Sequence, residues 1–204
     1  MVGLFTTWQD AISARQHVLD ERAADYFSDS CPGPDRMATI HIMGQGTRVT
    51  LELRPHEGVP PVRIGMTREE AREALAELGA AKPFARGRGA PLGWRVSEGD
   101  LSLFVYCDEA GFVEAVELAR PGLPGEPSCV QVTLQGLDVF GTPALELLAT
   151  IQERGIRVTD GEDYYPTAPD LALGFSRAGD DHGHVAPDDL PAYFESVLKG
   201  VRNN

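Results

Sequence analysis

Alternating apolar and polar residues predict a strand at residues 48–53, in which Val49, Leu51 and Leu53 share one face. After a Pro-Pro turn, Thr67 stands three residues before Glu70, which is the spacing of a capping box at a helix start. An apolar stripe then continues to Gly79, and a glycine commonly ends a helix in the left-handed conformation. The pattern therefore predicts a helix over residues 68–78.

Three further strand-like runs follow this helix. They cover residues 93–96, 101–106 and 112–119, and residues 108–111 form the turn between the last two. Residues 121–127 contain three prolines and two glycines, which continue neither a helix nor a strand. We therefore expect an antiparallel meander after the helix and a linker at 121–127.

The same order of elements recurs beyond this linker. A strand is expected at 129–134 and a helix near 143–154, with Thr142 as its cap and Pro143 as its first residue. Residues 171–175 correspond to the run at Leu101, and residues 193–197 correspond to residues 112–116. The expected fold is α+β, with two similar modules of one helix and an antiparallel sheet at 37–120 and 128–204. Chance matching of common elements is the alternative.

Residues 1–36 differ from the two expected modules. Apolar residues between Trp8 and Phe27 fit a helical stripe imperfectly, and residues 29–34 break any helix. We expect an N-terminal helical extension that docks on the body, binds a partner or precedes a start at Met37 or Met43.

The net charge of the 204-residue chain disfavours some classes of binding partner. A formal net charge of −13 repels both nucleic acid and anionic membrane surfaces. It suits a basic protein partner, but ordinary solubility is the favoured explanation. Three widely spaced cysteines form no Cys-x-x-Cys pair, and no signal-peptide or membrane-spanning pattern occurs. We expect a cytoplasmic protein with no cofactor, no nucleic acid partner and no membrane partner.

The run from Ile64 to Ala71, with the strands that follow it to Ala119, resembles a small α/β module. This module occurs in an outer-membrane assembly lipoprotein and, in tandem, in β-lactamase-inhibitor proteins. The resemblance rests on the Gly-Met-Thr-x-x-Glu helix start and on the Asp-x-x-Gly turn before the last strand. The second half lacks the methionine and the Thr-x-x-Glu spacing. The resemblance implies a fold and partner binding rather than catalysis.

Two groups of residues are candidates for a site. Asp181, His182 and His184 include a His-x-His pair that suits zinc, but they fall in an expected loop that needs no metal. Large aromatics follow the helix of each half, and two arginines accompany the first pair. The predicted binding residues are Phe84, Arg86, Arg88, Trp94, Tyr164 and Tyr165. These aromatics equally suit a role in closing the core.

The favoured function is a non-catalytic protein-binding module of the inhibitor or immunity type. The alternatives are a metal-dependent enzyme that uses the His182 and His184 loop, and a structural accessory domain.

Overall fold

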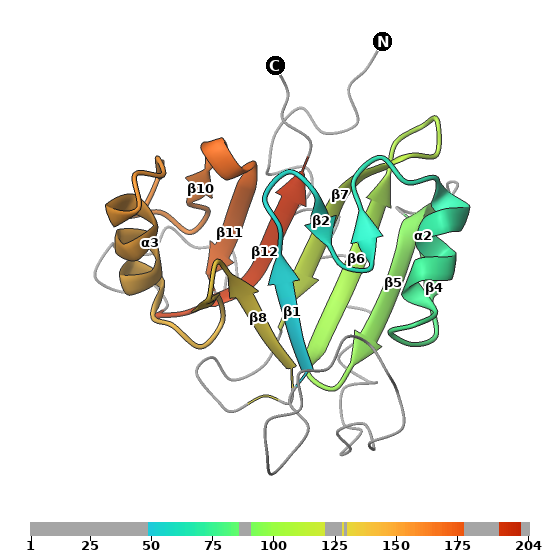
Figure 1. Ribbon diagram of the computed structural model, residues 1–204, viewed down its shortest axis with the longest axis horizontal. Coiled ribbons are helices and arrows are strands. Elements are labelled where there is room, and N and C mark those ends of the chain that lie inside the picture. The colour runs from blue at the N-terminus through green and yellow to red at the C-terminus, as the bar shows by residue number, and fades with distance from the viewer. Residues whose placement is uncertain (1–48, 86–90, 121–127, 129, 178–191, 201–204) are drawn as a thin grey trace.

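A seven-stranded antiparallel sheet lies at the centre of the computed structural model, which describes residues 49–85, 91–120, 128, 130–177 and 192–200 (Figure 1). Its strand order is β10-β11-β12-β7-β6-β5-β4. The strands are β4 (Lys82–Ala85), β5 (Pro91–Glu98), β6 (Leu101–Cys107), β7 (Val113–Ala119), β10 (Thr167–Ala168), β11 (Leu173–Arg177) and β12 (Phe194–Gly200).

The remaining elements lie on one face of this sheet, in front of it in Figure 1. A smaller sheet has the order β1-β8-β9, in which β1 (Val49–Leu53) and β8 (Val130–Leu134) are parallel and β9 (Leu137–Asp138) is antiparallel to β8. A hairpin of β2 (Gly58–Val59) and β3 (Val62–Arg63) follows β1. The helices are α2 (Arg68–Leu75), α3 (Ala144–Glu153) and a 3-10 turn at Pro169–Leu171. This arrangement confirms the α+β class predicted from the sequence.

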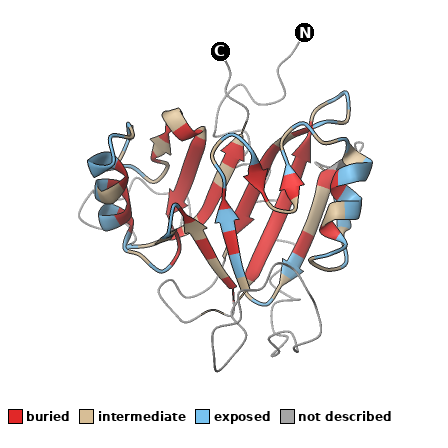
Figure 2. Ribbon diagram, in the orientation of Figure 1, coloured by how far each residue is buried: buried red, intermediate tan, exposed pale blue. Residues whose placement is uncertain are grey.

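The main core lies between the large sheet and these elements. Helices α2 and α3 bury one side each and expose the other (Figure 2). Val105 and Val116 on the central strands are fully buried, as are Ala71 and Leu75 on α2. The apolar stripe read from the sequence therefore faces the sheet.

The start of α2 is the capping box that the sequence predicts. The Thr67 hydroxyl accepts a hydrogen bond from the Glu70 amide at 3.3 Å, and the Glu70 carboxylate accepts one from the Thr67 amide at 2.8 Å. The start of α3 differs from the prediction. Pro143, and not Thr142, is the N-cap residue, and no side chain caps this helix. Thr142 gives its amide instead to the Asp138 carbonyl at 3.1 Å.

The two halves of the chain share both sheets. Strand β7 of the first half pairs with β12 of the second, and β1 pairs with β8. The linker expected at 121–127 and the extension at 1–36 lie outside the described residues. The structure thus joins the halves through continuous strand pairing on both sides of the main core.

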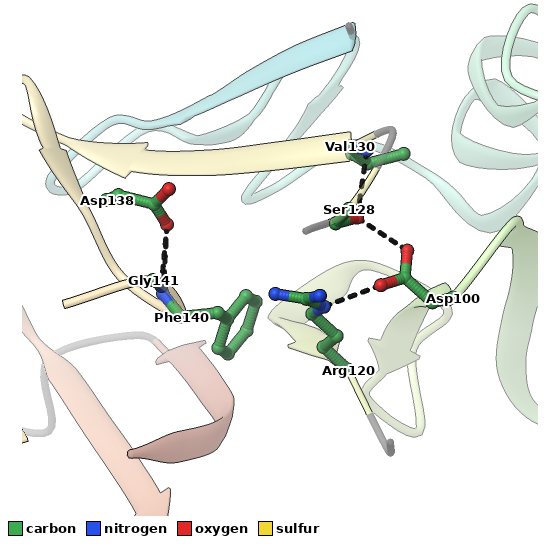
Figure 3. A network of polar contacts seen from close by, with 7 residues as sticks. All are labelled: Asp100, Arg120, Ser128, Val130, Asp138, Phe140 and Gly141. Carbon is green, nitrogen blue, oxygen red and sulfur yellow. Dashed lines mark hydrogen bonds and ion pairs between the residues drawn. The ribbon is translucent and has the colours of Figure 1, made fainter. Parts of the chain in front are cut away.

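Asp100 accepts hydrogen bonds from both residues that flank the segment 121–127. One carboxylate oxygen accepts a hydrogen bond from Arg120 at 2.6 Å, and the other accepts one from Ser128 at 2.6 Å (Figure 3). The Ser128 hydroxyl in turn accepts the Val130 amide at 2.9 Å, at the start of β8. Arg120 is the last described residue before the segment, and its side chain is 9 % exposed. One carboxylate thus fixes where the chain leaves β7 and where it enters β8.

We expect Asp100→Ala to lower the free energy of unfolding by about 2–3 kcal/mol, because it removes two hydrogen bonds to a charged group. Urea denaturation measures the change. Glu52→Ala is the control, since its ion pair with Arg54 is about half exposed on both sides and contributes under about 1 kcal/mol. If the two substitutions lowered the free energy of unfolding equally, the role assigned to Asp100 would be wrong.

Candidate functional site

The turn between β6 and β7 meets the amino-terminal end of α2 through three backbone hydrogen bonds. The Arg68 amide donates to the Gly111 carbonyl at 2.8 Å, and the Gly65 amide donates to the Val113 carbonyl at 2.8 Å. The Val113 amide donates back to the Met66 carbonyl at 2.7 Å. A helix start and a hairpin turn far apart in the sequence are thereby held side by side.

Phe112 projects from this junction. It is 46 % exposed, and among the described residues Leu145 on α3 is the other large apolar side chain classed as exposed. The position of Phe112 is fixed on both sides of its backbone: Thr67 forms a β-bridge with it, and its amide donates to the Asp108 carboxylate at 2.8 Å. The backbone of Phe112 is therefore held in place beside α2, and its side chain is partly exposed.

Acidic residues are frequent on the two elements that meet at Phe112. Helix α2 exposes Glu69, Glu70 and Glu73, Glu77 lies two residues beyond the last residue of the helix, and the adjoining turn adds Asp108 and Glu109. Arg72 is paired with Glu69 at 2.9 Å, and Arg63 lowers the pKa of Glu70 after the larger effect of the hydrogen bonds from Thr67. We call the exposed side of α2 together with residues 108–112 the α2 corner. Its charge is predominantly negative.

Two buried polar atoms lie at the base of this corner. The Trp94 indole donates to the Arg68 carbonyl at 3.0 Å, so the half-buried tryptophan supports the helix start. Within the part of the chain that the structure describes, the buried Nε of Arg68 and the buried Oε1 of Glu114 have no hydrogen-bond partner. Glu114 is the extra residue of a β-bulge, because Tyr106 pairs with Ala115 and Cys107 with Val113.

The thiol of Cys107 lies against Arg68 but is held in its neutral form. Burial raises its pKa, and this effect exceeds the opposing hydrogen bond from Arg68. Burial also raises the pKa of Glu114, and the Asp108 carboxylate adds to the shift. A protonated, buried thiol is a poor nucleophile. These groups therefore suit recognition by hydrogen bonding better than covalent chemistry.

The aromatic residues predicted to bind a partner do not gather on one surface. Phe84 is 8 % exposed and packs edge-on against Phe104 and Tyr106, on the sheet face away from α2. Trp94 lies on β5, on the α2 side. Tyr164 and Tyr165 are half-buried beside β11, where the Tyr164 carbonyl accepts the Arg177 amide. Four strand spacings, or roughly 19 Å, separate β5 from β11.

The single aromatic surface expected from the sequence is therefore not formed. Strand alternation puts Phe84 and Trp94 on opposite faces, and the sheet order separates the tyrosines from both. Arg86 and Arg88 lie outside the described residues, as do Asp181, His182 and His184. Among the described residues no three His, Cys, Asp or Glu side chains are close enough to hold a metal ion.

Sequence reasoning passed over Phe112, because strand periodicity alone makes it the first residue of a buried run. The signal that identifies it is its place directly after the Asp-x-x-Gly turn, one residue before β7 begins. Its pairing with Thr67, a residue 45 positions away, is not revealed by periodicity.

A hollow of about 240 Å³ lies beside the β2–β3 hairpin, lined by Arg54, Arg63 and the Pro60-Pro61 turn. The Arg54 guanidinium is paired with Glu52 at 3.2 Å and with Glu57 at 3.9 Å. The hollow is open and its main cation is neutralised, so it is a weaker candidate than the α2 corner.

Searches against protein-family models, curated proteins and solved structures find no significant match to this chain. None of the helices that the structure describes is long and apolar enough to cross a membrane.

Proposed function

We propose that the protein is a non-catalytic binding module, of the inhibitor or immunity type, that engages a basic protein partner through the α2 corner. The observation that carries the proposal is Phe112, which stands 46 % exposed in a surface rich in carboxylates. Aromatic side chains dominate binding energy when a partner desolvates them. The surrounding negative charge accelerates encounter with a positively charged partner and selects against acidic ones.

We further propose that the two halves are duplicated modules. Aligning residues 112–116 with 193–197 gives an offset of 81 positions, and this offset recurs in the structure. The bulged residues of the two halves, Glu114 and Glu195, differ by 81 positions. Val49 and Val130, which pair directly in the small sheet, also differ by 81. Strand pairs and bulges at one common offset support duplication over a chance match of common elements.

The carbonyl acceptors at the two helix starts fit the same alignment, although the first helical residues, Arg68 and Ala144, lie 76 positions apart. The amide of the first α2 residue, Arg68, donates to Gly111, and the amide of the first α3 residue, Ala144, donates to Ala192. These two acceptors again lie 81 positions apart. Tandem modules are what the resemblance to the β-lactamase-inhibitor proteins implies, and partner binding in the cytoplasm is the function we propose for them here.

Affinity capture with the full-length protein tests the proposed surface. We expect Phe112→Ala combined with Glu73→Lys to reduce recovery of a captured partner at least tenfold, because the substitutions remove the apolar anchor and reverse part of the charge. Recovery is measured by quantitative mass spectrometry against the unsubstituted protein. The captured partner should be basic, and its recovery should fall as salt rises.

Leu145→Ala is the matched control, because Leu145 is 66 % exposed on α3, away from the α2 corner. It should leave recovery unchanged. If a specific partner is recovered equally with all three proteins, the α2 corner is not the binding surface.

A further inference from the structure

The connection from α3 to the edge strand β10 is more than twice as long as the one from α2 to the opposite edge strand, β4. Thirteen residues, 154–166, join α3 to β10, whereas six residues, 76–81, join α2 to β4 at the other end of the large sheet (Figure 1). Connections of more than about twelve residues without a helix or strand of their own are uncommon in compact domains, and they are usually either functional or disordered.

Two threonines close part of this connection into a loop. The Thr159 amide donates to the Thr167 carbonyl at 2.9 Å, and the Thr167 amide donates to the Thr159 carbonyl at 3.0 Å. Their hydroxyls form a third hydrogen bond at 2.6 Å. We call residues 159–167 the tyrosine loop, because Tyr164 and Tyr165 lie within it. The two ends of the tyrosine loop are thus fixed to each other through both backbone and side chains.

Further hydrogen bonds hold the backbone inside the tyrosine loop. The Asp163 amide donates to the Asp160 carbonyl at 2.9 Å. The Arg177 side chain on β11 donates to the Asp163 carbonyl at 3.0 Å and to the Gly161 carbonyl at 2.9 Å. The Arg177 amide donates to the Tyr164 carbonyl at 3.0 Å. A loop whose backbone is already fixed loses little conformational entropy when it binds a partner. The tyrosine loop is therefore organised for binding in the free protein.

The side chains of the tyrosine loop combine aromatic rings with negative charge. The centroids of the Tyr164 and Tyr165 rings are 6.2 Å apart, the rings are tilted by 47°, and both residues are half-buried. Asp160, Glu162 and Asp163 are exposed, and residues 159–167 include no lysine or arginine. The guanidinium of Arg177 is buried, because this residue is 1 % exposed. The accessible charge of the tyrosine loop is therefore negative.

We propose that the tyrosine loop binds a lysine or arginine side chain of a protein partner. A tyrosine ring attracts a cation that lies over its face, and neighbouring carboxylates add a charge-assisted attraction. Tyrosine also supplies a large contact area at a low cost in side-chain entropy, which makes it frequent in binding loops. The proposal rests on the proposed function, because that function requires a basic partner, and it adds a second contact at the end of the large sheet opposite to α2.

A single-residue probe tests this surface in the full-length protein. N-acetyl-arginine amide carries a guanidinium, and N-acetyl-citrulline amide has nearly the same shape without the charge. We expect the arginine compound to shift the amide NMR signals of Gly161, Glu162 and Tyr165 in a saturable manner, and the citrulline compound to cause no saturable shift. Equal shifts with the two compounds, or no shift with either, would overturn the proposal.

Substitutions within the tyrosine loop identify the groups that attract the cation. Tyr164→Leu and Tyr165→Leu should each weaken binding of the arginine compound about two- to fivefold, since leucine keeps the apolar bulk but lacks an aromatic face. Glu162→Gln should weaken it as well, and because Glu162 is exposed this change removes no packing. Dissociation constants from the same NMR titration measure each effect.

Glu57→Gln is the matched control. Glu57 is a carboxylate outside the tyrosine loop, directly before β2, and its side chain is 64 % exposed. This substitution should leave binding of the arginine compound unchanged. If Glu57→Gln and Glu162→Gln weakened binding equally, net charge and not the tyrosine loop would be responsible, and the proposal would be wrong.

Phe112→Leu separates this proposal from the α2 corner. If it weakens binding of the arginine compound and the tyrosine substitutions do not, the cation binds at the α2 corner. That result overturns the role of the tyrosine loop and leaves the proposed function in place. If the tyrosine substitutions weaken binding of the probe while affinity capture recovers no basic partner, the tyrosine loop is supported as a cation-binding surface and the proposed function fails.

Discussion

Gly93→Ala is expected to cause the largest loss of stability among single methyl additions to this protein. Gly93 lies on β5 between Phe84 on β4 and Tyr106 on β6. A Cβ at this position would overlap the carbonyl oxygen of Val105, which is backbone of the neighbouring strand and cannot move alone. The clash forces β5 and β6 apart, and the Phe84 and Tyr106 rings, 5.3 Å apart across Gly93, lose their contact.

We expect the free energy of unfolding to fall by about 3 kcal/mol or more, at the upper end of overpacking effects. For a chain of this size that corresponds to a fall in melting temperature of roughly 10 °C. Gly200→Ala is the control, because Gly200 also lies on a strand, β12, and a Cβ there meets nothing within 4 Å. Thermal unfolding that is equal for the two variants would contradict the close approach at Gly93.

Lys199→Met is expected to stabilise the protein at neutral pH. Lys199 is 2 % exposed on β12, between Leu173 and Val116 of the neighbouring strands. Its amine donates to the Gly200 carbonyl at 2.8 Å, and burial lowers its pKa to about 8. A lysine in the unfolded chain has a pKa of about 10.4. At pH 7 the amine is protonated in both states, and burying this charge makes the folded state less stable.

The sign of the pH dependence follows from these two values. Below pH 8 both states are protonated, and the folded state bears the full cost of the buried charge. Between pH 8 and about 10.4 the folded protein loses this proton before the unfolded chain does, so stability rises with pH, by at most about 3 kcal/mol. Urea unfolding at pH 7, 8, 9 and 10 should show the rise in the unsubstituted protein and not in Lys199→Met. If the free energy of unfolding changed with pH in the same way in both proteins, the cost assigned to the buried Lys199 amine would be wrong.

The parts of the fold that follow local rules could be predicted from the sequence. The capping box at Thr67 needs only its own turn, and the runs at Leu101–Cys107 and Val113–Ala119 are short, largely apolar and bounded by turn residues, as expected of buried strands. Strands with weak alternation were missed. Residues 82–85 contain a proline and residues 167–168 are too short to show a period, yet both pair with longer neighbours.

The candidate site was harder to predict because it depends on pairing between distant segments. Trp94 was expected at a binding surface, but its indole is engaged by the Arg68 carbonyl, 26 positions away. Phe112 was expected in a strand, but β7 begins one residue later at Val113, and Phe112 forms an isolated bridge with Thr67 and is 46 % exposed. The pairing of β4 with β5 puts Phe84 opposite Gly93, the neighbour of Trp94, so the two aromatic side chains lie on opposite faces; β4 was not recognised as a strand from the sequence.

The shared sheets have a consequence for how the two halves exist. If the halves were separated, β1 and β7 of the first and β8 and β12 of the second would each lose a partner strand. An unpaired strand edge with an apolar face is a template for aggregation. Each half would therefore need a second chain to complete its sheets, much as subunits of a dimer do. Because the two halves are connected after Arg120, their strands pair within one chain. The pairing therefore does not depend on the protein concentration.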